Sequence, residues 1–172
     1  MTKALMIVDV QAGAFFGQWK IPNSEDLLIR IGERLVEARS SGTPVIHIQN
    51  DGEAGELDGP GAPLWELVFS TRDDELVIRK TKPNVFEDAS VAKQLKGLGI
   101  TELEVVGVQS DICVRACAIG AIDSGFMVSL DRNMHATYDG GWPGATEGPD
   151  ASDISDAIQA EVEAHALSCW LP

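Results

Sequence analysis

The chain alternates short apolar runs with segments of helical periodicity, and this alternation limits the folds open to it. Runs typical of buried strands lie at 4–10, 44–49, 75–80, 102–108 and 126–130. Segments with helical spacing of apolar residues lie at 23–42, 88–96, 113–123 and 152–165. Strands that alternate with helices imply right-handed crossovers. We therefore predict a three-layer α/β/α fold with a mostly parallel, Rossmann-like sheet covered by helices on both faces.

The size and composition of the chain favour one folded unit. Its 172 residues are 44% hydrophobic and 23% charged, which is typical of a globular domain with a sizeable core. The Gly/Pro-rich segments 52–63 and 139–150 are predicted to be long loops rather than linkers. We expect a single domain over residues 1–172.

The charge and the cysteines narrow the expected partners and the compartment. A formal net charge of −14 disfavours nucleic acid and anionic membranes as partners. No apolar stretch approaches the ~18 residues of a membrane span, and no secretory leader is evident. The 3 cysteines, 113, 117 and 169, lack metal-ligand spacing and favour reduced thiols. We expect a cytoplasmic protein that acts on a small molecule.

Three reactive side chains are predicted to follow strands of the sheet. Asp9 ends the first strand, Lys82 follows the third, and Cys113 begins the helix after the fourth. Each alone has an ordinary interpretation: a turn cap, a solvated charge and a small core residue. Ligand sites in such sheets lie at the carboxyl ends of the strands, where the three would supply a base, a charge stabiliser and a nucleophile. A helix N-terminus and a nearby ammonium would both favour the Cys113 thiolate.

Several motifs together resemble the isochorismatase-like cysteine hydrolases, the group that includes nicotinamidases and N-carbamoylsarcosine amidohydrolases. The motifs are LMIVDVQAGAF, TKPNVF and VVGVQSDICVRACAIGAIDSGF, at residues 5–15, 81–86 and 105–126. The resemblance implies a catalytic triad of Asp9, Lys82 and Cys113. It also implies a cis peptide bond at Val108-Gln109 and an oxyanion hole formed by the backbone N–H groups of Gln109 and Cys113.

The resemblance further implies an amidohydrolase that cleaves a C–N bond of a small amide, ureido compound or lactam through a thioester. Metal-holding nicotinamidases carry an Asp-x-His pair after the second strand, and the segment HIQNDGEAG at 47–55 lacks it. We therefore expect no metal and no other cofactor. A homo-oligomer, dimer or tetramer, is expected as well.

Aromatic residues and one histidine lie in segments that could form the wall of a pocket. Phe15, Trp19 and Trp65 fall in or near predicted loops and could line the pocket or pack in the core. His135 follows the fifth strand and could line the site or have a structural role. Cys117, one helical turn after Cys113, is predicted to be a packing residue.

Two other functional classes remain open at this stage. A response-regulator receiver domain also has acids after its first strand and a Lys-Pro pair, but about 90 residues follow Lys82 here, so the order of elements differs. A catalytically silent binding protein of the same family is the second alternative. Within the family, a vinyl-ether hydrolase acting on isochorismate is the alternative enzyme, although the cysteine favours an amidase.

Overall fold

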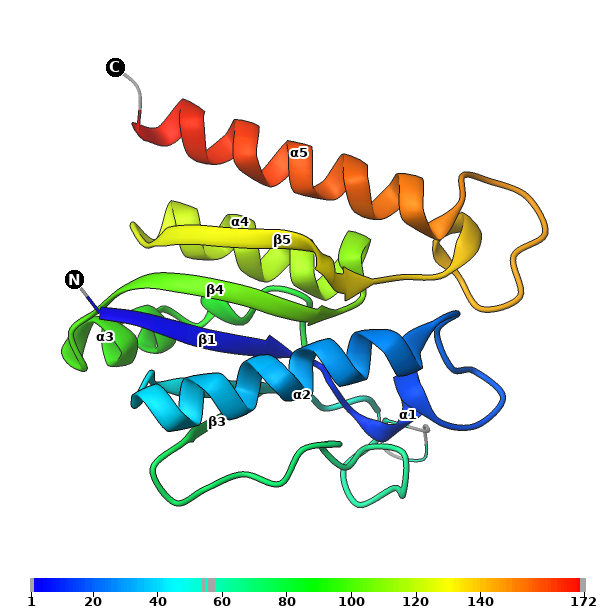
Figure 1. Ribbon diagram of the computed structural model, residues 1–172, viewed down its shortest axis with the longest axis horizontal. Coiled ribbons are helices and arrows are strands. Elements are labelled where there is room, and N and C mark those ends of the chain that lie inside the picture. The colour runs from blue at the N-terminus through cyan, green and yellow to red at the C-terminus, as the bar shows by residue number, and fades with distance from the viewer. Residues whose placement is uncertain (1, 54, 56–57, 171–172) are drawn as a thin grey trace.

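The computed structural model describes residues 2–53, 55 and 58–170, which form a parallel sheet covered by helices (Figure 1). The sheet contains 5 strands in the order β3-β2-β1-β4-β5, and every pair of neighbours is parallel. The strands are β1 (Thr2–Val8), β2 (Val45–Asn50), β3 (Leu76–Lys80), β4 (Ile100–Val108) and β5 (Met127–Ala136). The predicted α/β class and parallel sheet are therefore confirmed.

The helices lie on both faces of the sheet, as a parallel sheet requires. They are α1 (Ala12–Phe15), α2 (Ser24–Ser41), α3 (Ala89–Gly97), α4 (Arg115–Asp123) and α5 (Ala151–Trp170), with short turns η1 (Val85–Glu87), η2 (Ser110–Val114) and η3 (Asp139–Gly141). Helix α2 covers one face, while α3, α4 and α5 cover the other (Figure 1). None of the helices in the described ranges has the length and apolar character needed to cross a bilayer.

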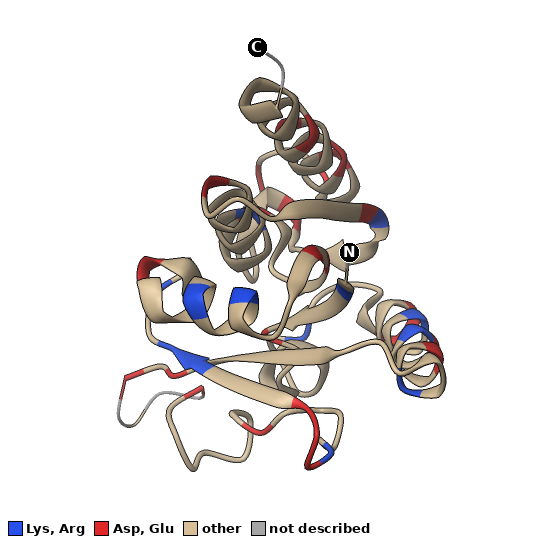
Figure 2. Ribbon diagram, turned by 90° about the vertical axis from the view of Figure 1, so that its left-hand side faces the viewer, with Lys and Arg blue, Asp and Glu red and all other residues tan. Residues whose placement is uncertain are grey.

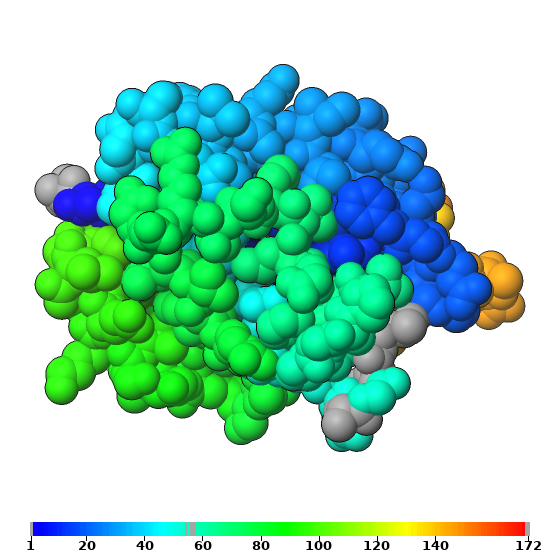
Figure 3. Space-filling view, turned by 90° about the horizontal axis from the view of Figure 1, so that it is seen from below, coloured from blue at the N-terminus to red at the C-terminus, as the bar shows by residue number. Residues whose placement is uncertain are grey.

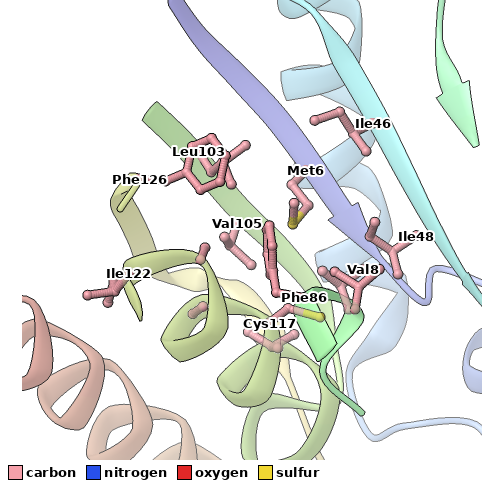
Figure 4. Close-up of a cluster of buried hydrophobic side chains, with 14 of the residues drawn as sticks. Met6, Val8, Ile46, Ile48, Phe86, Leu103, Val105, Cys117, Ile122 and Phe126 are labelled. Atoms are coloured by element: carbon pink, nitrogen blue, oxygen red, sulfur yellow. The ribbon is translucent and has the colours of Figure 1, made fainter. Parts of the chain in front are cut away.

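Two apolar cores hold these layers together, one on each face of β1. Figure 4 shows the first, in which Met6 and Val8 of β1 meet Phe86, Cys117 and other side chains. The second core packs Leu5 and Ile7 against α2. Alternate residues of β1 point to opposite faces and both sets are buried, so residues 4–8 of the strand form one continuous apolar run.

The segment that joins β2 to β3 contains no helix in its described residues, 51–53, 55 and 58–75. Part of it instead crosses to the side of α2, where Val68 and Phe69 pack on the second core. Phe69 lies 3.4 Å from the position that a Cβ atom would occupy at Gly32 of α2, so this contact is close. Figure 3 shows described parts of this segment as cyan-to-green atoms beside the blue residues of α2. The segment thereby brings residues 58–65 to the carboxyl edge of the sheet.

The predicted elements are present, and several of their boundaries differ from the expected ones; strand β1, for example, covers Thr2–Val8 and ends before Asp9. The helix expected at 113–123 begins with the π-helical turn η2, and regular α-helix starts only at Arg115. Strand β5 continues to Ala136, beyond the apolar run at 126–130, because it keeps pairing with β4 after a register shift between Val105 and Gly107. Helix α5 extends to Trp170, two turns beyond Val162, the last residue that it buries fully.

A buried ion cluster ties β3 to α2. Arg39 of α2 donates two hydrogen bonds to Glu75, at 2.7 and 2.9 Å, and His47 of β2 contacts the same carboxylate at 3.1 Å. The side chain of Glu75 is only 3% exposed. The Arg39 hydrogen bonds lower the pKa of Glu75 to about 2, so this carboxylate is ionised at neutral pH. The buried His47 side chain therefore has a hydrogen-bond partner.

We expect Arg39→Ala to destabilise the protein by about 3 kcal/mol, because it leaves the buried Glu75 carboxylate without its cation. Urea unfolding monitored by circular dichroism measures this change. Lys20→Ala, which breaks the exposed Lys20–Glu25 pair, is the matched control and should cost less than about 1 kcal/mol. Equal losses for the two variants would contradict the structural role assigned to the cluster.

Candidate active site

Three strand ends and one turn meet at the carboxyl edge of the sheet. Asp9 directly follows β1, Asn50 ends β2, and Lys80 ends β3. Cys113 lies in η2, the turn that follows β4. Because all these strands are parallel, the four side chains converge on the same edge.

The Lys80 ammonium is the centre of this cluster. Its Nζ atom donates to Asp9 Oδ2 at 2.8 Å, to Asn50 Oδ1 at 3.1 Å and to Cys113 Sγ at 3.2 Å. An ammonium has three N–H donors, so each has an acceptor. The side chain of Lys80 is 3% exposed, and a buried cation of this kind needs such partners.

Lys82, predicted to be the basic member of the site, does not reach it. Its side chain is 67% exposed and its Nζ atom contacts Glu87 at 2.8 Å. Lys80 is the last residue of β3 and pairs with Asn50 of β2, so its side chain is still held by the sheet. Lys82 lies two residues beyond the strand, in a turn where its side chain faces solvent. The prediction of Lys82 is therefore wrong, and Lys80 takes its place.

Asp9 has an unusual backbone and one free oxygen. Its φ angle of 52° lies in the left-handed region, which Asp tolerates better than most residues. Its backbone N–H donates to Ile48 of β2 at 3.0 Å, which holds the turn against the sheet. Oδ2 accepts from Lys80, whereas the buried Oδ1 has no hydrogen-bond partner among the described residues. That oxygen can accept a proton.

Burial and charge act in opposite directions on the Asp9–Lys80 pair. Burial raises the pKa of the Asp9 carboxyl, and the Lys80 ammonium opposes this rise. Burial also lowers the pKa of Lys80, but the charge of Asp9 and its hydrogen bond to the ammonium act against burial, and the pKa of Lys80 stays above its ordinary value. Lys80 is therefore a permanent cation of the site at neutral pH.

Cys113 differs from the expectation of a stabilised thiolate. Burial raises the pKa of its thiol, the Asp9 carboxylate raises it further, and Lys80 only partly opposes them. Cys113 also precedes α4, within the turn η2, rather than opening a regular helix. The resting group is a neutral thiol, so any reaction that uses the sulfur must first remove its proton.

The loop that carries Cys113 is fixed to β5 and α5. The Val108-Gln109 peptide bond is cis. Ser110 Oγ lies 2.8 Å from His135 Nδ1 and 3.0 Å from Ser155 Oγ, while Thr137 Oγ1 donates to Asp111 at 2.6 Å. These contacts hold two consecutive residues of the loop from one side. The role left open for His135 is thus structural: the residue is 3% exposed and supports the loop from behind.

A glycine brings the loop close to β1. Gly107 has a φ angle of 128°, and a Cβ atom built there would lie 2.0 Å from the Val8 carbonyl oxygen. Any other residue would push β4 away from β1 at this level. Because Val8 precedes Asp9, and Gly107 precedes the Val108-Gln109 bond, the contact sets the spacing between the carboxylate and the loop.

A pocket of about 250 Å³ opens beside the cluster. Its wall contains Asp9, Gln11, Gly13, Ala14, Trp19, Asn50, Asp58, Leu64, Val108, Gln109, Ile112, Cys113 and Tyr138. Trp19 is among the predicted pocket residues, and the structure places it in this wall. The wall thus combines apolar side chains with a few polar groups, as small-molecule sites do.

The other predicted pocket residues lie elsewhere. Phe15 is 3% exposed and belongs to the core on the α2 side. Trp65 points toward Asp51, to which its Nε1 donates at 2.9 Å, and Arg79 lies 5.0 Å above its ring. His135 supports the Cys113 loop from behind. Of the two roles left open for each of these three residues, lining the pocket is therefore ruled out.

The polar residues that organise the pocket were not predicted from the sequence. Gln11 donates to the Asn50 carbonyl at 3.0 Å and accepts from the Asn50 N–H at 2.8 Å, which fixes Asn50 beside Lys80. Asn50 in turn donates to Asp58 at 2.9 Å. Asn50 could have been found as the polar residue that ends the second strand. Asp58 could not, because nothing in the sequence shows where a long loop folds back.

The chain matches the family model described as "Isochorismatase domain" over residues 3–145. The chain belongs to the isochorismatase family. A crystal structure of an isochorismatase from Pseudomonas putida KT2440 is 27% identical, with a TM-score of 0.84, and the match covers 94% of this chain and 83% of that one. The fold and the family predicted from the sequence are thus confirmed.

Two relatives from Streptomyces noursei are each described as "Streptothricin hydrolase". They are 39% and 40% identical to this chain, and both matches cover 95% of it. The chain spans only 57% and 63% of the length of these relatives.

We expect stability to depend on the protonation of His135. Burial lowers the pKa of this imidazole to about 4, whereas the ordinary value is 6.5. The unfolded chain therefore binds the proton first, so the free energy of unfolding should fall as pH drops from about 6.5 to 4, by up to about 3 kcal/mol.

Urea unfolding at several pH values measures this effect in the wild type and in His135→Asn. The variant cannot titrate, so its stability should fall less over the same window. Curves that run parallel for the two proteins would show that His135 is not the group responsible.

Proposed function

We propose that this protein is a cysteine-dependent hydrolase that cleaves a C–N bond of a small amide, ureido compound or lactam through a thioester. The observation that carries the proposal is the position of Lys80 Nζ between Asp9 Oδ2, at 2.8 Å, and Cys113 Sγ, at 3.2 Å. The pocket beside them contains both Asp9 and Cys113 in its wall. The site thus has a base, a fixed cation and a nucleophile that a small substrate can reach.

In the first half of the reaction, the free oxygen of Asp9 accepts the thiol proton of Cys113. The sulfur then forms a bond to the carbonyl carbon of the substrate, and the carbonyl oxygen becomes negatively charged. The backbone N–H groups of Gln109 and Cys113 are the donors proposed for this oxyanion. When the C–N bond breaks, the leaving nitrogen takes the proton from Asp9, and the acyl group remains on sulfur as a thioester.

In the second half, water replaces the amine. Asp9 accepts a proton from the water as its oxygen attacks the thioester carbon, and the same N–H groups bind the second oxyanion. The C–S bond then breaks, the acid product leaves, and the proton on Asp9 returns to the sulfur. The protein is thereby restored with a neutral thiol.

Lys80 makes this cycle possible through its fixed charge. Removing the proton from Cys113 places a negative charge on sulfur in a buried site, which is costly without a nearby cation. Lys80 already donates to that sulfur, so the cation is in place before the charge forms. Because Asn50 and Asp9 accept the other two N–H groups, the ammonium does not have to reorient during the reaction.

The names of the matched relatives support the proposal that this protein is a hydrolase. Two matched proteins are described as streptothricin hydrolases, and this chain aligns with them over 95% of its length. Streptothricin is therefore included among the compounds to be tested. The proposed activity itself rests on the site of this chain.

The test is a panel of small substrates incubated with the wild type: streptothricin, nicotinamide, a ureido acid and a cyclic lactam. Release of amine or ammonia, and of the ring-opened acid for the lactam, is measured by mass spectrometry. We expect turnover of at least one compound, loss of that turnover in Cys113→Ala, and a covalent acyl adduct on Cys113 after rapid quenching.

Cys117→Ala is the matched control for the cysteine variant. Cys117 is fully buried and donates to the Pro83 carbonyl at 3.3 Å, and burial raises the pKa of its thiol to about 12. The control variant should keep most of its activity. Turnover by Cys113→Ala at the wild-type rate would overturn the nucleophile assignment and favour a thiol-independent reaction such as vinyl-ether hydrolysis.

We also expect a large loss of activity when Lys80 is replaced and almost none when Lys82 is replaced. Lys80→Met removes the cation beside the sulfur and should lower kcat/KM by about 10³-fold, within the usual range for removing one stabilising group. Lys82→Met removes an exposed charge paired with Glu87 and should change kcat/KM by less than about twofold. Circular dichroism checks that both variants fold, and a larger loss for Lys82→Met would contradict the site described here.

A further inference from the structure

The charges in the pocket wall are unbalanced. Its charged members are Asp9 and Asp58, and it contains no Lys, Arg or His among the residues that the structure describes. The charge of Asp9 is matched by Lys80, which contacts it at 2.8 Å. Asp58 makes no ion pair with any described cation, and its side-chain partner there is the neutral amide of Asn50, at 2.9 Å.

Asp58 is held firmly although it lies in a long loop. Its carbonyl accepts from the Gly52 N–H at 2.9 Å, and Asn50 Nδ2 donates to its Oδ2 atom. Oδ1 lies 2.0 Å from the position that a Cβ atom would occupy at Gly52, so only glycine leaves room for the carboxylate. Since Asn50 also accepts from Lys80, Asp58 belongs to the same hydrogen-bonded chain as the reactive cluster.

We infer that the pocket selects substrates that carry a cationic group, an ammonium or guanidinium, beside the bond to be cleaved, and that Asp58 is the residue that recognises this group. A carboxylate in a pocket wall without a cation partner lowers its energy by binding one from the ligand. The inference rests on the proposed function for the nature of the cleaved bond, but charge recognition can be measured separately.

Two further features favour a cationic ligand. Trp19 and Tyr138 lie in the same wall, and aromatic rings attract cations. The chain has a formal net charge of −14, and Figure 2 shows acidic positions on helices and loops alike. Such a field raises the local concentration of cations and disfavours anionic substrates.

A matched series of three primary amides tests the inference. β-Alaninamide carries an ammonium where butanamide has a methyl group, and succinamate has a carboxylate at the corresponding end. Ammonia release by the wild type should give a kcat/KM at least about tenfold higher for β-alaninamide than for butanamide, with succinamate lowest. Added salt should reduce the preference, because part of it is electrostatic.

Asp58→Asn should bring the ratio of kcat/KM for β-alaninamide over butanamide close to one. Asp73→Asn is the matched control, because it removes the same charge from an exposed residue outside the pocket wall and should leave the ratio unchanged. Equal loss of the preference in both variants would assign it to the overall field and overturn the role of Asp58. A preference that appears only with added divalent cations, and disappears with a chelator, would make Asp58 a metal ligand and also overturn it.

Binding to Cys113→Ala separates this inference from the proposed function. Isothermal titration calorimetry should show tighter binding of β-alaninamide than of butanamide to this variant, and loss of the difference when Asp58→Asn is added. If the preference holds in binding but the wild type hydrolyses none of these amides and no compound of the substrate panel, the inference stands and the proposed function fails. If amides are hydrolysed through Cys113 without any charge preference, the inference fails and the proposed function stands.

Discussion

The arrangement of this protein around its pocket depends on one buried ammonium. Lys80 lies inside the molecule with a side-chain exposure of 3%, which is tolerable only because three acceptors surround it. Those acceptors come from the turn after β1, the end of β2 and the turn after β4. Losing one acceptor would therefore disturb the sheet edge and the reactive cluster together. The same contacts that satisfy the cation also set the distance between the base and the nucleophile.

The sheet topology explains how these groups meet although they are far apart in sequence. Strand β1 lies at the centre of the order β3-β2-β1-β4-β5, so Asp9 lies between the ends of β2 and β4. Gly107 allows β4 to approach β1 closely, and the contacts of Ser110 with His135 near the end of β5 and of Asp111 with Thr137 just after it hold the loop from the other side. The position of Cys113 is therefore determined by three neighbouring strands and not by its own helix.

The sequence predicted the fold and the position of Asp9 and Cys113 at one edge of the sheet, because these depend on local patterns: apolar runs, helical spacing and polar residues directly after strands. The sequence did not identify the basic residue of the site, because that choice depends on which lysine side chain the strand still holds in the folded sheet. Lys80 and Lys82 have the same local chemistry, and only the pairing of Lys80 with Asn50 shows which one the sheet still holds. Asp58 and Trp65 belong to a long loop whose path is set by packing on α2, which periodicity does not reveal. The neutral state of Cys113 depends on burial, which a helix N-terminus alone does not predict.

The proton transfer that activates the neutral thiol depends on how the charges of the site are arranged. Burial raises the pKa of the Asp9 carboxyl, the Asp58 carboxylate adds to this rise, and Lys80 opposes it. Transfer of the thiol proton from Cys113 to Asp9 moves the negative charge from the carboxylate to the sulfur, so the net charge of the site does not change. Burial and Asp58 make Asp9 a stronger base for this step. The Lys80 ammonium contacts both the carboxylate and the sulfur, so the same cation stabilises the negative charge before and after the transfer.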